Sequence, residues 1–316
     1  MSLNVKNLFK RYGNNWILKD ISFDVEKGEI LGIFGPSGSG KSTLLKVLVD
    51  PENSNGGTIQ WEGRDVSHHG GGFSIYPPPA KAGWRSIFGG NHSKNDLSQA
   101  IDHALTGANE VLCLDDPFCK MGDRTKENAI GKMCQTAKGR GLTVLLATSN
   151  YDEIFDACDR VAVLVDKDIK QVGTPQEIYD HPNSAAVAGA VGRNNIFGSR
   201  RLTSSKSDHP EFITLEGEHR LFAQKADVRT LGPINKNILL AIRPEHISIS
   251  FGASFPEDNL IKAVVTGVRP RGASTLVEFD SRGLKLEAIV LRLVGLNLGD
   301  ECMLGLPPDR IQILAD

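Results

Sequence analysis

The stretch that most constrains the fold is GPSGSGKST, residues 35–43. It fits the pattern GxxxxGK[ST], follows a short apolar run at 30–34, and precedes apolar residues at helical spacing in KSTLLKVLVD. Glycines allow backbone N–H groups to close around phosphate oxygens, and the following helix directs the positive end of its dipole toward them. A glycine-rich turn without function could also match the residue pattern, but it would not explain the buried strand before it and the helix after it. The stretch predicts a phosphate-binding loop between a buried strand and a helix.

Each polar residue of this loop has an expected role. Lys41 should reach the β- and γ-phosphates of a nucleotide, and the Ser42 hydroxyl should ligate Mg²⁺. The nucleotide-binding residues are therefore expected to be Gly35, Ser37, Gly38, Ser39, Gly40, Lys41, Ser42 and Thr43.

Two adjacent carboxylates end another apolar run, VLCLDDPF at 111–118. Asp115 is expected to hold the Mg²⁺ through water, although a helix N-cap or a solvated loop acid would also fit. Asp116 is suited to orient or deprotonate an attacking water. An exposed loop acid explains Asp116 equally well, and the residues alone leave both interpretations open.

Length and composition set wider limits. A chain of 316 residues is long enough for about two domains, and 40% hydrophobic with 23% charged residues is ordinary globular composition. A net charge of −2 gives no electrostatic reason to expect nucleic acid. Five scattered cysteines without a CxxC pair indicate reduced thiols in a cytosolic protein, and no apolar run is long enough to cross a membrane.

The fold class follows from the order of the elements. Strand and helix patterns alternate to about residue 165, which predicts an α/β domain with a parallel sheet. Within it, DLSQAIDHALTGA predicts a helix with its first Asp, Asp96, as the N-cap, and KENAIGKMCQTAKGRG predicts a crossover helix that ends before Gly141. Residues 68–95 are rich in Gly and Pro and predict a loop. Beyond residue 200 short strands and turns predict a small all-β domain, a barrel.

Longer stretches resemble one family, the ATP-binding subunits of ABC importers of the maltose, iron(III), sulfate and polyamine type. The opening LFKRYGNNWILKDISFDVEKGEILGIFGPSGSGKSTLL is similar to that family's, as are GGTIQWEGRDV and DRVAVLVDKDIKQVGTPQEIYDHPNSAAVAGAVGRNNIF. IRPEHISIS and GLPPDRIQIL resemble its C-terminal oligobinding-type β domain, called TOBE. The resemblance implies an ATP-binding domain over 1–195 and an OB-like TOBE domain over 196–316.

The resemblance also implies cofactors, partners and location. It implies ATP with Mg²⁺, an adenine base stacked on Tyr12, transmembrane permease subunits, a solute-binding protein and a second ATP-binding subunit, identical or different. The chain would then lie in the cytoplasm, on the inner face of the membrane, held there by the permease subunits. For Tyr12, ordinary packing of an aromatic at a strand end remains an alternative.

Several positions depart from the family pattern. Asp116 stands where the family has a glutamate, and Ser149 stands where it has a histidine that faces the γ-phosphate. Ser74 aligns with the glutamine of the Q-loop, and NHSKN at 91–95 occupies the place of the LSGGQ signature. IFGGN at 87–91 contains two glycines but lies too far upstream in the sequence to take the place of the signature. The helical subdomain of the family is expected to be largely missing around 68–100.

These departures leave two readings open. The first is a dimeric ATPase subunit that drives import, with Asp116, Lys41 and Ser149 as the catalytic residues. The second is a hydrolysis-deficient nucleotide-binding subunit with a structural or regulatory role. A glutamate-to-aspartate change shortens the side chain by one methylene, and a misplacement of about 1 Å can cost on the order of 100-fold in rate.

Overall fold

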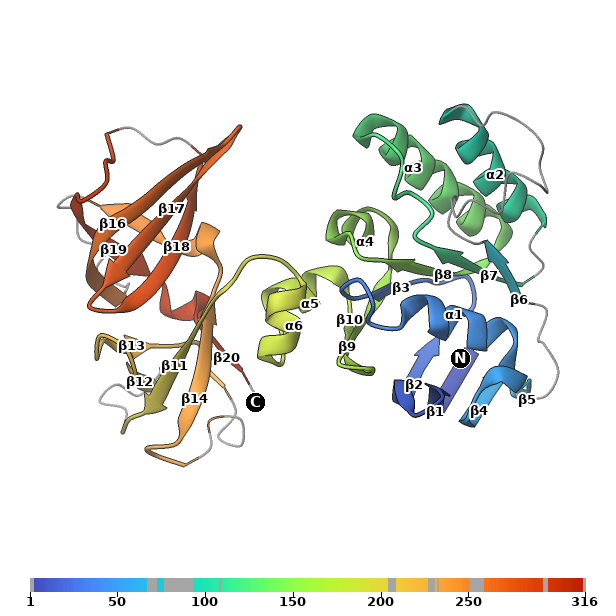
Figure 1. The fold of residues 1–316 in the computed structure, drawn as a ribbon, viewed down its shortest axis with the longest axis horizontal. Helices are drawn as coiled ribbons and strands as arrows, with labels where there is room; N and C mark the ends of the chain where they lie inside the picture. The colour runs from blue at the N-terminus through green and yellow to red at the C-terminus, as the bar shows by residue number, and fades with distance from the viewer. Residues whose placement is uncertain are drawn as a thin grey trace. The chain divides into compact units, whose positions relative to one another are not determined.

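The computed structural model describes residues 3–66, 73–76, 94–107, 110–203, 209–226, 231, 233–250, 259–291 and 295–314, with the backbone alone over 94–100. The chain divides into two compact units, Met1–Asp180 and His181–Asp316. The first unit is built of strands and helices, and the second almost entirely of strands (Figure 1).

A six-stranded sheet forms the centre of the first unit. In sheet order its strands are β10 (Asp168–Gly173), β9 (Arg160–Val165), β3 (Ile30–Phe34), β8 (Thr143–Thr148), β7 (Val111–Asp115) and β6 (Phe73–Tyr76). All neighbours are parallel except β10, which pairs antiparallel with β9. Every residue of β3, β7 and β8 is buried, as expected for parallel strands covered on both faces. The predicted α/β class is confirmed, with one antiparallel edge strand.

A second, antiparallel sheet covers one side of the first unit. Its order is β2 (Asn15–Val25), β1 (Leu3–Tyr12), β4 (Gly56–Trp61) and β5 (Arg64–Asp65). Helix α1 (Lys41–Val49) lies between the two sheets, followed by the short η1 (Pro51–Asn53) (Figure 1). Leu44, Leu45 and Leu48 of α1 share one core with both sheets, so α1 is held from two sides.

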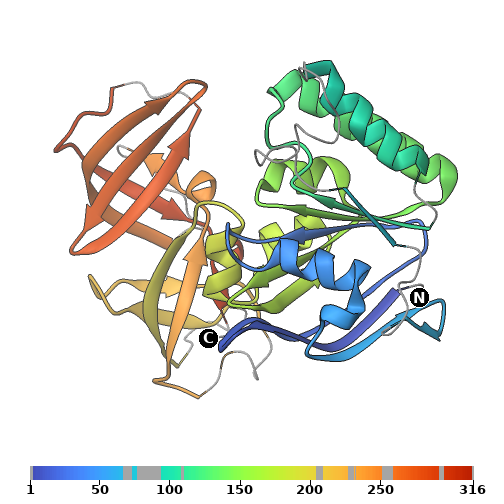
Figure 2. The ribbon, with the colours of Figure 1, turned by 45° about the vertical axis from the view of Figure 1, so that its right-hand side comes forward.

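Helices α2 (Lys94–Gly107), α3 (Asp123–Arg140) and α4 (Tyr151–Ala157) lie on the opposite face of the central sheet from α1 (Figures 1 and 2). Helix α3 is the predicted crossover helix, and it ends before Gly141, which takes the left-handed conformation with φ 62°. Helix α2 already begins at Lys94, so the expectation that Asp96 is its N-cap was wrong. Asp96 instead lies in the first turn, where an acidic residue is also favourable.

Helix α5 (Pro175–Asp180) ends the first unit, and α6 (Ala185–Ala190) is the first element of the second. Ala188 of α6 packs in one cluster with Ala241 and Leu314 of the second unit. The structural division therefore precedes the boundary expected at 195/196, because α6 belongs by its packing to the strands that follow it.

The second unit contains two five-stranded antiparallel sheets. The first has the order β13 (Arg220–Phe222), β12 (Glu211–Thr214), β11 (Asn195–Arg201), β14 (Asn237–Ile242) and β20 (Gln312–Leu314). The other has β15 (Ser248–Ser250), β19 (Glu301–Leu306), β16 (Asn259–Arg271), β17 (Ser274–Ser281) and β18 (Leu284–Val290). Short helices η3 (Pro244–His246) and η4 (Pro308–Arg310) precede β15 and β20.

One apolar core is shared by these two sheets. Phe212 and Leu240 from the first sheet and Val277, Phe279 and Leu304 from the second belong to it, and all are at most 1% exposed. This arrangement confirms the all-β second domain predicted from the short strands. In neither unit is any described helix long and apolar enough to cross a membrane.

Candidate functional site

The loop between β3 and α1 has the form predicted for a phosphate cradle. Strand β3 ends at Phe34 and α1 begins at Lys41, with Gly40 as its N-cap. Gly38 and Gly40 have φ values of 83° and 110°, which other residues rarely adopt. The N-terminus of α1 therefore faces the loop, where its free N–H groups and its dipole favour an anion.

The cradle has little room for additional atoms. A Cβ on Gly35 would lie 2.2 Å from the carbonyl oxygen of Leu164, and one on Gly40 would lie 3.2 Å from that of Ile17. Glycine is therefore required at position 35 by close packing against β9. Ser39 Oγ is buried and has no hydrogen-bond partner among the described residues. A buried hydroxyl without a partner at this place fits a ligand with phosphate oxygens.

Lys41 is folded into the loop that it follows. Its side chain is 5% exposed, and its Nζ donates hydrogen bonds to the carbonyl oxygens of Gly35 (2.8 Å) and Pro36 (3.0 Å). Burial lowers the pKa of Lys41, and the nearby carboxylates of Asp116 and Asp115 partly oppose that effect. The ammonium group is thus held at the cradle by neutral carbonyls, available to an anionic ligand.

Ser42 and Asp115, the two residues expected to hold Mg²⁺, lie within hydrogen-bond distance of each other beside the cradle. The Ser42 hydroxyl donates a 2.9 Å hydrogen bond to Oδ1 of Asp115, the last residue of β7. Asp115 is 3% exposed, and burial raises its pKa, against the effect of the hydrogen bond from Ser42. A hydroxyl and a carboxylate are hard oxygen donors of the kind that Mg²⁺ prefers, so this pair could hold that ion.

The backbone of Asp116 has an unusual conformation. Its φ is 47°, in the left-handed region, and its N–H donates a 2.8 Å hydrogen bond to the carbonyl oxygen of Ala147 on β8. Non-glycine residues in this region are uncommon, and they cluster at functional sites. No sequence pattern indicated this turn.

A small pocket of about 230 Å³ lies next to Asp116. Its lining residues are Asp116, Phe118, Cys119, Met121, Lys126, Thr148, Ser149, Asn150 and Glu153. The structure thus brings Asp116 and Ser149 to the same pocket. Ser149 is exposed and follows directly after β8.

Sequence reasoning missed Glu153, which supports the loop that carries Ser149. Its carboxylate accepts a 2.7 Å hydrogen bond from Thr148 Oγ1, which itself accepts the N–H of Asn150 at 3.0 Å. Lys126 of α3 lies 3.8 Å from the same carboxylate, which is 4% exposed. Burial raises the pKa of Glu153. The only sequence signal for Glu153 was an acidic residue five positions after the end of β8, and such residues are too common to indicate a site.

Tyr12 lies at the end of β1 and is 56% exposed. It pairs with Asn15 across the β1–β2 hairpin, and β2 continues to Ile17 beside Gly40 of the cradle. The predicted base-stacking residue is therefore an exposed aromatic on a hairpin that borders the phosphate loop. Ser37 is exposed on that loop, and Thr43 is half-buried in the first turn of α1.

The other positions predicted from the sequence lie in or beside segments that the structure does not describe. Ser74 lies inside strand β6, where it pairs with Leu112 of β7. Of the signature position 91–95, only the backbone of 94 and 95 is described, as the start of α2. IFGGN at 87–91 and most of 68–100, where the shortened helical subdomain was expected, lie outside the described residues.

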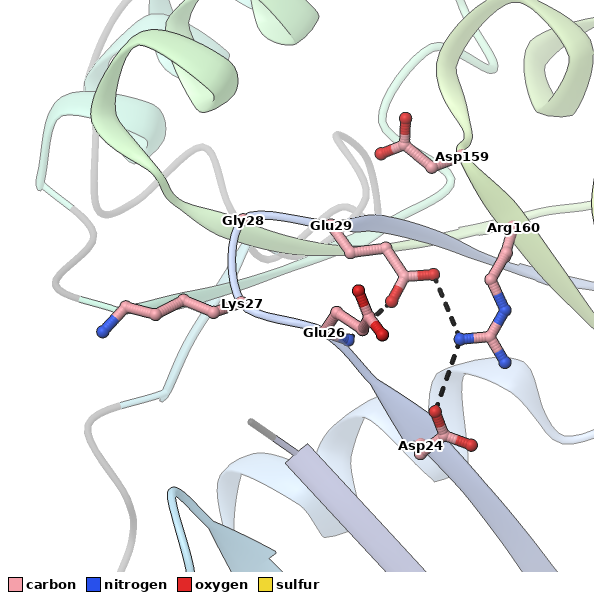
Figure 3. Close-up of a pocket in the computed structure, with 7 residues that line it drawn as sticks. All are labelled: Asp24, Glu26, Lys27, Gly28, Glu29, Asp159 and Arg160. Atoms are coloured by element: carbon pink, nitrogen blue, oxygen red, sulfur yellow. Dashed lines mark hydrogen bonds and ion pairs between the residues drawn. The ribbon is translucent and has the colours of Figure 1, made fainter. Parts of the chain in front are cut away.

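A second pocket, of about 640 Å³, lies at the other end of β3 (Figure 3). It is lined by Asp24, Glu26, Lys27, Gly28, Glu29, Asp159 and Arg160. The Arg160 guanidinium lies 3.4 Å from both Asp24 and Glu29, and Glu29 also accepts the N–H of Glu26 at 2.6 Å. Arg160 thus pairs with two of the four acidic residues of this pocket. Within the described ranges, no group of three acidic, Cys or His side chains could hold a metal.

Comparisons with known proteins find similar sequences in both units of the chain. Residues 18–99 match the ABC transporter family model, and residues 240–314 match the TOBE domain model. The chain is 30% identical to a sulfate/thiosulfate import ATP-binding protein of Synechocystis, with 76% of this chain and 82% of that protein covered. It is 26% identical to the protein of the same name from Burkholderia mallei, with 95% and 96% covered.

A third relative transports a different solute by name. The chain is 24% identical to a spermidine/putrescine import ATP-binding protein of Trichormus variabilis, with 79% of this chain and 76% of that protein covered. All three names contain the words "import ATP-binding protein", but the third names a different solute from the other two.

Proposed function

This chain belongs to the ABC-transporter family of import ATP-binding proteins, and we propose that it binds Mg-ATP at the β3–α1 cradle to drive solute uptake through partner membrane subunits. The observation that carries the proposal is the 2.9 Å contact between Ser42 and Asp115 beside the buried ammonium of Lys41. This contact brings together the loop after β3 and the acid that ends β7, in a chain whose relatives are import ATP-binding proteins.

The residues of the cradle divide the work of nucleotide binding. The N-terminus of α1, Lys41 and the Ser39 hydroxyl would hold the phosphate oxygens, and Lys41 would exchange its two carbonyl contacts for them. Ser42 and Asp115 would hold Mg²⁺, which when bound neutralises charge on the phosphates. Tyr12 would stack on the adenine.

Hydrolysis in this proposal depends on the pocket between β7 and β8. Asp116 would accept a proton from the attacking water or orient it, and Ser149 would donate a hydrogen bond toward the γ-phosphate. Both line the pocket, and Glu153 holds the Ser149 loop through Thr148. An aspartate has a shorter reach than the family glutamate, so we propose that turnover is slower than a glutamate would allow.

The proposed partners are those of an importer. They are transmembrane permease subunits, a solute-binding protein and a second ATP-binding subunit, with the chain on the cytoplasmic side of the membrane. The names of the relatives support this assignment. We propose that residues 1–195 form the ATP-binding domain and 196–316 the TOBE domain.

The experiment measures Mg-ATP binding and steady-state hydrolysis on the purified chain, beside Lys41→Ala and Asp116→Asn. We expect Lys41→Ala to lose binding and Asp116→Asn to retain binding but lose turnover. Lys19→Ala is the matched control, because Lys19 is an exposed lysine on β2. If the wild-type chain binds no Mg-ATP, the proposed function is wrong.

A further inference from the structure

The β1–β2 hairpin presents an aromatic ring beside the phosphate cradle. Tyr12 pairs with Asn15, and Ile17 follows two residues later, about 7 Å along the strand. The carbonyl oxygen of Ile17 would lie 3.2 Å from a Cβ on Gly40, so the hairpin packs directly against the start of α1. A nucleotide whose phosphates occupy the cradle would have this hairpin as a neighbour.

The Tyr12 ring is not buried by the fold. Tyr12 is 56% exposed, which places it among the few large hydrophobic residues that are exposed in the described part of the chain. By contrast, Leu8 and Leu18 on the same hairpin are completely buried. An exposed aromatic ring has freedom to rotate, and a stacking partner must restrict that freedom when it binds. A feature that holds the ring in advance would lower this cost.

Lys10 supplies such a feature. Its Nζ lies 4.8 Å from the centroid of the Tyr12 ring, within the range of a cation–π interaction. The two residues are separated by one position on β1, and although the pairing with β2 shifts register between Lys10 and Arg11, the ammonium lies over the Tyr12 ring. Lys10 itself is only 8% exposed, so the cation is held in place rather than extended into solvent.

The structure also fixes the position of the Lys10 ammonium. Its Nζ donates a hydrogen bond to the carbonyl oxygen of Asn53, in the short helix after α1. Two further contacts attach β1 to the same segment: Asn55 N–H donates to the Phe9 carbonyl at 2.8 Å, and Arg11 N–H donates to Asn55 Oδ1 at 2.9 Å. The segment that follows α1 thereby positions the Lys10 ammonium beside the Tyr12 ring.

We propose that Lys10 is a positioning residue for the nucleotide base. Its ammonium occupies one side of the Tyr12 ring, restrains the ring and draws electron density toward itself, and the exposed surface of the ring stacks on a purine. This inference rests on the proposed ATP-binding function and adds to it a residue that acts only on the base, not on the phosphates.

The test compares a ligand that carries the base with one that does not. ADP and pyrophosphate, each with Mg²⁺, are titrated calorimetrically into wild type, Lys10→Met, Tyr12→Ala and the double variant. We expect Lys10→Met to weaken ADP binding about three- to fivefold and to leave pyrophosphate binding unchanged. In the Tyr12→Ala background, Lys10→Met should have no further effect on ADP.

Two additional variants control for charge and folding. Lys19→Met removes an equal charge from the exposed face of β2 and should change neither affinity. Lys10→Arg keeps a cation and should bind ADP like wild type, whereas Lys10→Gln should bind like Lys10→Met. If the methionine variant does not fold, the comparison of arginine with glutamine decides.

The possible results separate the inference from its premise. Equal weakening of ADP and pyrophosphate by Lys10→Met, or no weakening of either, overturns the role of Lys10. A loss that is undiminished in the Tyr12→Ala background also overturns it, because Lys10 would then act without the ring. A wild-type chain that binds neither ligand refutes the proposed function itself.

Discussion

The two ends of strand β3 both bury charged side chains, but they satisfy those charges differently. At the amino end, Glu29 is paired with Arg160 and with the N–H of Glu26. At the carboxyl end, the Lys41 ammonium donates hydrogen bonds to two carbonyls of its own loop and, among the described residues, to no acidic side chain.

The difference extends to a buried hydroxyl group. Ser39 Oγ at the carboxyl end has no partner among the described residues, and burial both lowers the pKa of Lys41 and raises that of Asp115. Burial raises the pKa of Glu29 as well, and there, as at Lys41 and Asp115, neighbouring groups of the fold partly oppose the effect. One end of the sheet is complete in itself, and the other is suited to a ligand.

The largest effect should follow from removing the cradle's charge. Lys41→Ala removes a buried cation that would contact phosphate, and charge-assisted hydrogen bonds of this kind justify a loss of Mg-ATP affinity of about 30- to 100-fold. Competition against a fluorescent ATP analogue measures it. Arg160→Met should leave the affinity unchanged, and a similar loss in both variants would contradict the division between the two ends.

The next effect concerns stability at the amino end. Arg160→Met leaves the carboxylate of Glu29 buried without its ion-pair partner, and we expect the free energy of unfolding to fall by about 1–2 kcal/mol, reduced because Arg160 is itself 31% exposed. Urea unfolding measures it. Lys138→Met, which breaks the exposed pair with Asp159, is the control and should cost less than about 0.5 kcal/mol. Equal losses would mean that the Glu29 pair is no more than a surface contact.

A smaller effect should appear at Asp116, where the backbone is left-handed. Asp and Asn tolerate this conformation better than other residues, so Asp116→Glu should lower the free energy of unfolding by about 0.5–1 kcal/mol, while Asp116→Asn should not. The two variants differ in both charge and length, so the comparison is made without nucleotide and at several pH values. A glutamate variant as stable as the asparagine variant would show that the turn imposes no such constraint.

The smallest effect is a pH dependence at Glu153. Burial raises its pKa in the folded state above the ordinary value near 4.5, so between these two values the folded chain binds more protons than the unfolded chain. Stability contributed by this group is present below pH 4.5 and is lost as the pH rises through the folded-state pKa. Glu153→Gln should flatten that decline in the free energy of unfolding. Glu127→Gln, at an exposed site on α3, should leave the decline as steep as in wild type.

Local patterns predicted the parts of the site that are local in the chain. The strand, the glycine-rich loop and helix α1 are consecutive, so their spacing alone indicated the cradle. Asp115 could also be placed, because parallel strands align their carboxyl ends and β7 was recognisable as a buried apolar run.

Contacts between distant segments could not be predicted in this way. Lys126 and Glu153 lie on different helices and meet only because α3 packs on α4. The cation under Tyr12 depends on Asn53, more than 40 residues away in the chain. The same reason explains why the division into compact units at 180/181 precedes the boundary proposed at 195/196, since α6 packs against strands that come much later in the chain.

The left-handed turn at Asp116 bears on the difference of one methylene between this aspartate and the glutamate of the family. With φ at 47°, the direction in which the Cα–Cβ bond leaves the chain is set by the turn, and the N–H bond to Ala147 fixes the turn to the neighbouring strand. The position of the carboxylate therefore depends first on where the main chain aims it and only then on how many methylenes follow.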